Sequence, residues 1–109
     1  MMNNTEFRIL WSDYNSGRFE SISINTETET RGEGIRKWFI LTREQNDDSG
    51  YNFRQRWTVP LEDMLRGFGM KDYAELADYL EGKYLENKSA LGDIKTECDS
   101  KGVKLEHTS

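Results

Sequence analysis

The sequence predicts an α+β fold in which a three- to four-stranded antiparallel sheet is followed by two to three helices packed on one face. Three observations support this class. Apolar and polar residues alternate over much of the first sixty residues, short runs of turn-forming residues separate those segments, and apolar residues recur at helical spacing after Pro60. Strands gathered first and helices second are typical of α+β domains.

The first two predicted strands form a hairpin. In EFRILWSDY the apolar Phe7, Ile9 and Trp11 alternate with polar residues, NSG supplies a turn, and RFESISIN alternates again. The next segment, TETETRGEG, is polar on both sides, so it is either a solvated edge of the second strand or a mobile loop with glycine hinges.

Two further strands are predicted in GIRKWFILT and YNFRQRWTVP, joined by a loop over REQNDDSG. Placing Phe39 opposite Phe53 makes one face of this pair almost wholly apolar. The same register places Trp38 opposite Arg54, and Arg36 opposite Arg56, on the reverse face.

Pro60 ends the strands, and a short helix is expected over PLEDMLRGF. Asp72, with Glu75 three residues later, is typical of a helix N-cap, and the helix that follows should end near Asn87. A third helix is expected from Ser89 to Cys98.

A chain of 109 residues fits one domain, 1–109, with strands over about 5–59, helices over about 60–99 and a frayed tail over 103–109. No apolar run is long enough for a membrane helix, the N-terminus lacks the pattern of a signal peptide, and Cys98 is a lone cysteine. We therefore expect a cytoplasmic protein without a membrane partner. The oligomeric state is left open.

Residues with catalytic chemistry are sparse. The one histidine, His107, lies next to the C-terminus, and Cys98 falls on the apolar side of a helical pattern, so a nucleophile with its base is not expected. One thiol and one imidazole cannot close a zinc site, and DYNSG is better explained as a turn than as a calcium loop. These patterns predict no enzyme, no cofactor and no metal.

The reverse face of the sheet is the first candidate binding surface, because a tryptophan among arginines is typical of protein interfaces. Its residues would be Arg36, Trp38, Arg54 and Arg56. The alternative is that helices cover this face and bury Trp38.

The acidic side of the predicted helix after Asp72 is the second candidate, with Asp78 and Glu81 as the residues that would meet a basic partner. A merely solvated face explains the same residues. The acidity also argues against a helix-turn-helix reading, since this helix would repel phosphates.

The sequence therefore predicts a small, acidic, non-enzymatic protein-binding module, with a net charge of −5. The alternative is a protein that binds single-stranded nucleic acid through the Trp38, Arg54 and Arg56 face. An enzyme whose site is assembled between chains ranks third. In its small size, acidity, single domain and sparse catalytic residues, the chain is similar to phage and mobile-element proteins that inhibit host machinery, including inhibitors of CRISPR nucleases. That resemblance assigns no function to any particular residue of this chain.

Overall fold

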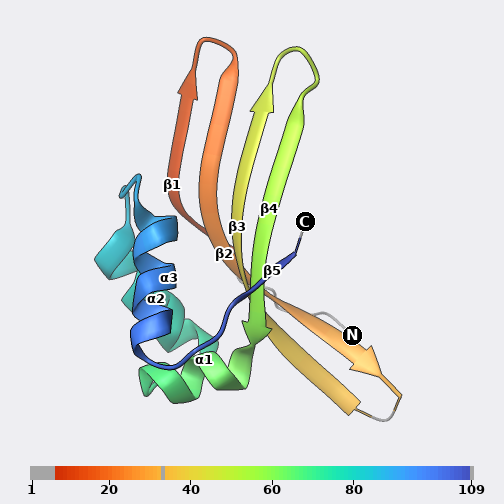
Figure 1. Ribbon diagram of the computed structural model, residues 1–109, viewed down its shortest axis with the longest axis vertical. Coiled ribbons are helices and arrows are strands. Elements are labelled where there is room, and N and C mark those ends of the chain that lie inside the picture. Colours follow the sequence, from red (N-terminus) through yellow and green to blue (C-terminus); the bar gives the residue numbers. More distant parts are fainter. Residues whose placement is uncertain (1–6, 33, 109) are drawn as a thin grey trace.

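A computed structural model describes residues 7–32 and 34–108 of the chain. Five antiparallel strands form one sheet in the order β1-β2-β3-β4-β5, and three helices follow β4 in sequence (Figure 1). The predicted α+β class is confirmed, with one strand more than expected. The elements are β1 (Arg8–Asn15), β2 (Arg18–Arg31), β3 (Gly34–Asp47), β4 (Asn52–Pro60), α1 (Leu61–Phe68), α2 (Tyr73–Tyr84), α3 (Ala90–Ser100) and β5 (Glu106–Thr108).

The fifth strand lies in the tail that the sequence predicts to fray. Glu106, His107 and Thr108 pair with Thr58, Trp57 and Arg56 of β4, and Val103 just before them is buried. The tail is therefore fixed by an apolar anchor and by backbone pairing, two features that its short length and polar composition do not reveal.

The β1–β2 hairpin is confirmed, but a bulge in β1 changes which residues face the core. The register shifts between Ile9 and Trp11, so that Leu10 is fully buried while Phe7 and Ile9 are 60% and 44% exposed. The Leu10 carbonyl accepts a hydrogen bond of 2.6 Å from the Glu86 N–H beyond α2. The simple alternation predicted for Phe7, Ile9 and Trp11 is therefore wrong, because a bulge adds one residue to the strand.

The predicted pairing of Phe39 with Phe53 is also wrong. Phe39 lies opposite Val59, six residues further along β4, and Leu41 lies opposite Trp57. The reason is that β3 continues to Asp47 and absorbs residues assigned to a loop, so the connection to β4 is a tight turn. The Asp47 carboxylate stabilises this turn by accepting from the N–H groups of Ser49 and Tyr51 at 2.9 and 3.1 Å.

The six-residue difference is even, so each residue keeps its predicted face. Phe39, Leu41, Trp57 and Val59 are all buried on one side of the sheet. Figure 1 shows the three helices on one side of the sheet as well. The core joins these strand residues to apolar helix residues, among them Leu61, Met64, Leu76, Leu80, Tyr84, Ile94 and Cys98.

The helices begin and end largely as the sequence predicts. The Asp72 carboxylate caps α2 by accepting from the Glu75 N–H at 2.9 Å, and Glu75 accepts from the Lys71 N–H at 3.2 Å. Gly69 ends α1 in the left-handed region, where a residue without a Cβ is favoured. In the described part of the chain, no helix is both long and apolar enough to cross a membrane.

The TETET segment belongs to strand β2, which settles the choice between strand and loop. Beyond the pairs Arg8–Ile24 and Trp38–Pro60, the paired residues 28–31 of β2 and 34–37 of β3 extend past β1 and β4. We call this two-stranded extension the projecting hairpin; it points away from the helices at the lower right of Figure 1. Its exposure allows the Thr and Glu side chains on both faces.

Candidate functional site

The six residues that the sequence singles out lie in three separate places. Arg36 and Trp38 lie at the base of the projecting hairpin, Arg54 and Arg56 lie further along the sheet, and Asp78 and Glu81 belong to α2. Arg54 is opposite Glu44, and Trp38 is opposite Pro60, so the predicted pairs Trp38–Arg54 and Arg36–Arg56 do not form. The predicted surface of one tryptophan and three arginines is therefore two separate regions, one with Arg36 and Trp38 and one with Arg54 and Arg56.

Arg54 and Arg56 each have a glutamate partner on a neighbouring part of the sheet. Arg54 binds Glu44 at 2.8 Å, and Arg56 binds Glu27 at 3.1 Å. The ion pair between Glu27 and Arg56 joins β2 to β4 and crosses β3. On β3, Trp38 lies opposite Glu27 and Thr42 lies opposite Arg56, and Ile40 between them is 1% exposed. These arginines line a small hollow of about 190 Å³. Their charge is balanced by carboxylates, which weakens their attraction for an acidic partner.

Asp78 and Glu81 both contact Arg8 of β1, with N–O distances of 2.6 and 3.3 Å. The Arg8 side chain is 16% exposed, whereas that of Asp78 is 71% exposed. This contact joins α2 to β1. It explains why acidic residues occupy these two positions, and no binding to another protein is needed for that explanation.

A wide hollow lies beside Arg36 and Trp38, and we call it the basic groove. Its volume is about 730 Å³. The Arg36 guanidinium carbon is 5.6 Å from the centre of the Trp38 ring, within cation–π range. The groove is lined by Arg36, Trp38, Thr58, Val59, Pro60, Asp63, Arg66, Gly67, Lys101, Gly102, Val103, Lys104 and Glu106.

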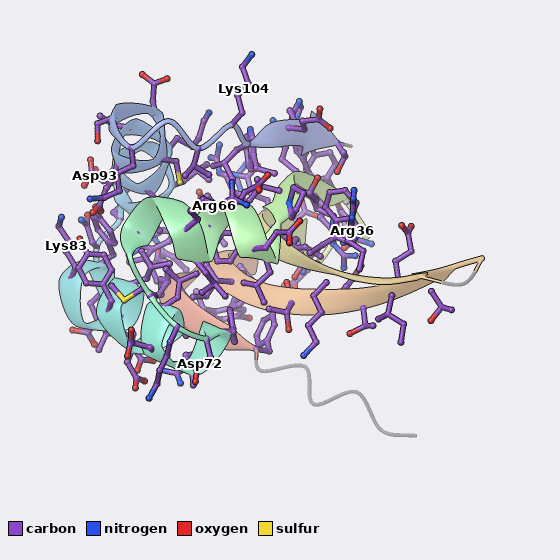
Figure 2. All side chains as sticks on the ribbon, turned by 90° about the horizontal axis from the view of Figure 1, so that it is seen from below. Arg36, Arg66, Asp72, Lys83, Asp93 and Lys104 are labelled. Carbon is purple, nitrogen blue, oxygen red and sulfur yellow. The ribbon has the colours of Figure 1, made fainter. Side chains whose placement is uncertain are left out.

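Four cationic and two acidic side chains line the basic groove, which gives it two excess positive charges in a chain of net charge −5. Figure 2 shows the origin of three of the cations: Arg36 at the base of the projecting hairpin, Arg66 on α1 and Lys104 on the segment after α3. Three distant segments of the sequence therefore supply one positively charged surface.

A close approach between α1 and the segment after α3 shapes one wall of the groove. A Cβ added to Gly67 would lie 2.4 Å from a methyl carbon of Val103, so glycine is needed for this approach. Val103 is 6% exposed and anchors the segment between Lys101 and Lys104. The groove depends on this anchored tail.

Two of the cations already have carboxylate neighbours. Arg66 lies 3.3 Å from Asp63, and Lys101 lies 3.8 Å from Glu97 while its ammonium covers the Phe68 ring. Sequence reasoning missed Arg66, Lys101 and Lys104 as site residues. The available signal was the alternation of Val103 and Leu105 with polar residues, which indicates an ordered strand-like tail.

A second cluster of polar residues joins α2 to α3. The Glu97 carboxylate, with its side chain 10% exposed, accepts hydrogen bonds from the hydroxyls of Tyr79 and Tyr84 and from Lys83 at 3.3 Å. Burial opposes ionisation of Glu97, but these donors hold its pKa below the usual range. Burial, together with the bond to Glu97, raises the pKa of Tyr84 to about 12. Every member has a partner, so this cluster is structural.

Cys98 and His107, the thiol and the imidazole of the chain, are not among the residues that line the groove. Cys98 is 1% exposed, and burial raises the pKa of its thiol to about 12. The His107 ring packs on Trp57 with 4.9 Å between ring centres. Within residues 7–32 and 34–108, no group of three or more His, Cys, Asp or Glu side chains could hold a metal ion.

No protein-family model, curated protein or solved structure matches this chain.

Proposed function

We propose that the protein is a non-enzymatic binding module whose basic groove receives an acidic segment of a protein partner. The observation that carries this proposal is the gathering of Arg36, Arg66, Lys101 and Lys104 around Trp38 in an otherwise acidic molecule. An inhibitor and an adaptor would both act through such a contact.

The types of residue in the groove favour a protein partner. Tryptophan and arginine dominate the binding energy of protein interfaces, and a few anchors of ~2 kcal/mol each are enough for a stable complex. Trp38 is half-buried, so its ring is held in place before a partner binds, which lowers the entropy cost of association. The long Arg36 side chain is partly ordered by the same ring.

Charge reversal in the groove tests the proposal. Tagged wild-type protein, Arg36→Glu and Lys104→Glu are compared in capture from a lysate of the source cells, after nuclease treatment, with bound proteins identified by mass spectrometry. Lys88→Glu is the matched control, because Lys88 is exposed and is not part of the groove lining. We expect one protein to be retained by wild type and Lys88→Glu and lost by both groove variants, at unchanged melting temperatures. Equal capture by all four proteins would contradict a role for the groove.

Single-stranded nucleic acid is the second candidate ligand, because Trp38 beside several cations could stack a base while phosphates meet the cations. Its affinity would come mainly from phosphate contacts, and only four cations line the groove. Fluorescence anisotropy with a labelled oligothymidylate tests this candidate. If all four cations contact phosphates, the logarithm of the affinity should fall with the logarithm of salt concentration with a slope of about −3. Binding of the oligonucleotide that Arg36→Glu abolishes, without protein capture, would favour this second function.

A further inference from the structure

One edge of β3 is open along the projecting hairpin. β4 ends at Pro60, opposite Trp38, and the chain turns there into α1. Residues 34–37 of β3 are therefore paired with β2 on one side, while the described sheet pairing gives them no strand on the other. Backbone N–H and C=O groups on such an edge can pair with an added strand.

Two hollows flank this open edge. The basic groove lies on one side, and a second hollow of about 390 Å³, which we call the apolar notch, lies on the other. Arg36 and Pro60 line both hollows, which places each of them at the point where β4 leaves β3. The notch is lined by Ile35, Arg36, Lys37, Pro60, Leu61, Glu62 and Leu65.

The two hollows differ in the apolar side chains that they offer. The groove lining has two excess positive charges and the notch lining has one, and the notch adds the exposed Ile35 and the partly exposed Leu65, whereas Leu61 is buried. Ile35 is 72% exposed, more than any other large hydrophobic residue in the described part of the chain. An isoleucine at this position, in a hairpin otherwise rich in Thr and Glu, leaves most of its side-chain surface in contact with water.

We propose that an extended segment of the partner adds to the β3 edge at residues 34–37, with acidic side chains directed into the basic groove and apolar side chains directed into the apolar notch. Successive residues of a strand point to opposite faces, so the segment should alternate acidic and apolar residues. Charge complementarity with the groove selects the acidic positions. This inference rests on the proposed function, since it specifies how the acidic segment binds.

The test uses two synthetic six-residue peptides of equal composition, labelled with the same dye. One alternates Glu and Val, and the other carries three Val followed by three Glu, so the pair differs only in order. Binding to the full chain is measured by fluorescence anisotropy at peptide concentrations where both are monomeric. We expect the alternating peptide to bind about tenfold more tightly, the equivalent of part of one buried aliphatic side chain.

Variants on each side of the edge separate the two contributions. Ile35→Asp should weaken the alternating peptide about tenfold, because it removes apolar area and repels carboxylates. Arg36→Glu should weaken both peptides, and Lys88→Glu should weaken neither. Hydrogen exchange followed by NMR supplies a readout of the backbone: the alternating peptide should slow exchange of amides within residues 34–37.

Equal affinity for the two peptides, or binding without new amide protection at residues 34–37, would overturn strand addition. If neither peptide binds while protein capture still depends on Arg36, strand addition is wrong and the proposed function stands. If neither peptide binds and capture does not depend on the groove, both are wrong. Equal binding of the two peptides that Arg36→Glu still weakens would indicate a purely electrostatic groove.

Discussion

Glu97→Gln should be among the most destabilising polar substitutions in this protein. The carboxylate accepts from Tyr79 through one oxygen and from Tyr84 through the other, the latter at 2.5 Å, and its side chain is only 10% exposed. A glutamine keeps the shape but offers one acceptor oxygen, and it also loses the attraction to Lys83. Losing one hydrogen bond to a charged group costs about 1.5–3 kcal/mol.

The sign of the pH dependence follows from the lowered pKa of Glu97. A carboxyl whose pKa is depressed in the folded state contributes stability above its unfolded value, and that contribution is lost as the pH falls through the folded value. The ordinary pKa of a glutamate is 4.5, so the contribution of Glu97 to the free energy of unfolding should be complete near neutral pH. It should decline once the pH falls below about 4.5. The difference between wild type and Glu97→Gln should therefore narrow in acid.

Urea unfolding followed by circular dichroism at neutral pH and at several acidic pH values measures this difference. Glu62→Gln is the matched control, because Glu62 is exposed, and we expect it to change the free energy of unfolding by less than about 0.5 kcal/mol. A Glu97→Gln effect as small as that of the control, or an effect that stays constant into acid, would refute the reasoning. Either result would show that solvent, rather than the tyrosines and Lys83, sets the energy of this carboxylate.

Two further predictions concern the tail and the sheet. Gly67→Ala should destabilise the protein by about 1–3 kcal/mol, because the new methyl group would overlap Val103, even though alanine is the better helix former. The same overlap should lower the protection of β5 amides in hydrogen exchange. A stabilised variant would contradict the close approach between α1 and Val103. The ion pair between Glu27 and Arg56 should show a coupling energy of about 0.2–1 kcal/mol in a double-mutant cycle at low salt, and less at high salt, since both side chains are partly exposed; a larger, salt-independent coupling would show that the pair is effectively buried.

The residue pattern predicted the local parts of the fold well. The hairpin turn at NSG, the cap at Asp72 and the faces of Phe39 and Leu41 all depend on residues close together in the chain, and the structure confirms them. The bulge at Leu10 escaped prediction, because the carbonyl that it turns toward α2 is bonded by the distant Glu86 N–H.

The candidate site was predicted in part. Arg36 and Trp38 line the basic groove as the alternation of β3 suggests, but Arg54 and Arg56 lie elsewhere, next to glutamates. The residues of α1 and of the tail that complete the groove could not be assigned to it, because their proximity to Trp38 depends on how the helices return to the sheet.

The order of residues along the chain is enough to show which side chains share a face, where the strands are followed by helices and where α2 begins, because these features follow from periods of two and 3.6 residues. Which residues lie opposite one another depends on the folded chain. A shift of six residues between β3 and β4 leaves every face unchanged, so alternation alone cannot distinguish the two registers. The length of β3, the tight turn at Asp47 and the anchoring of Val103 resolve that ambiguity, and together they place Trp38 beside Arg66 and Lys104 and away from Arg54.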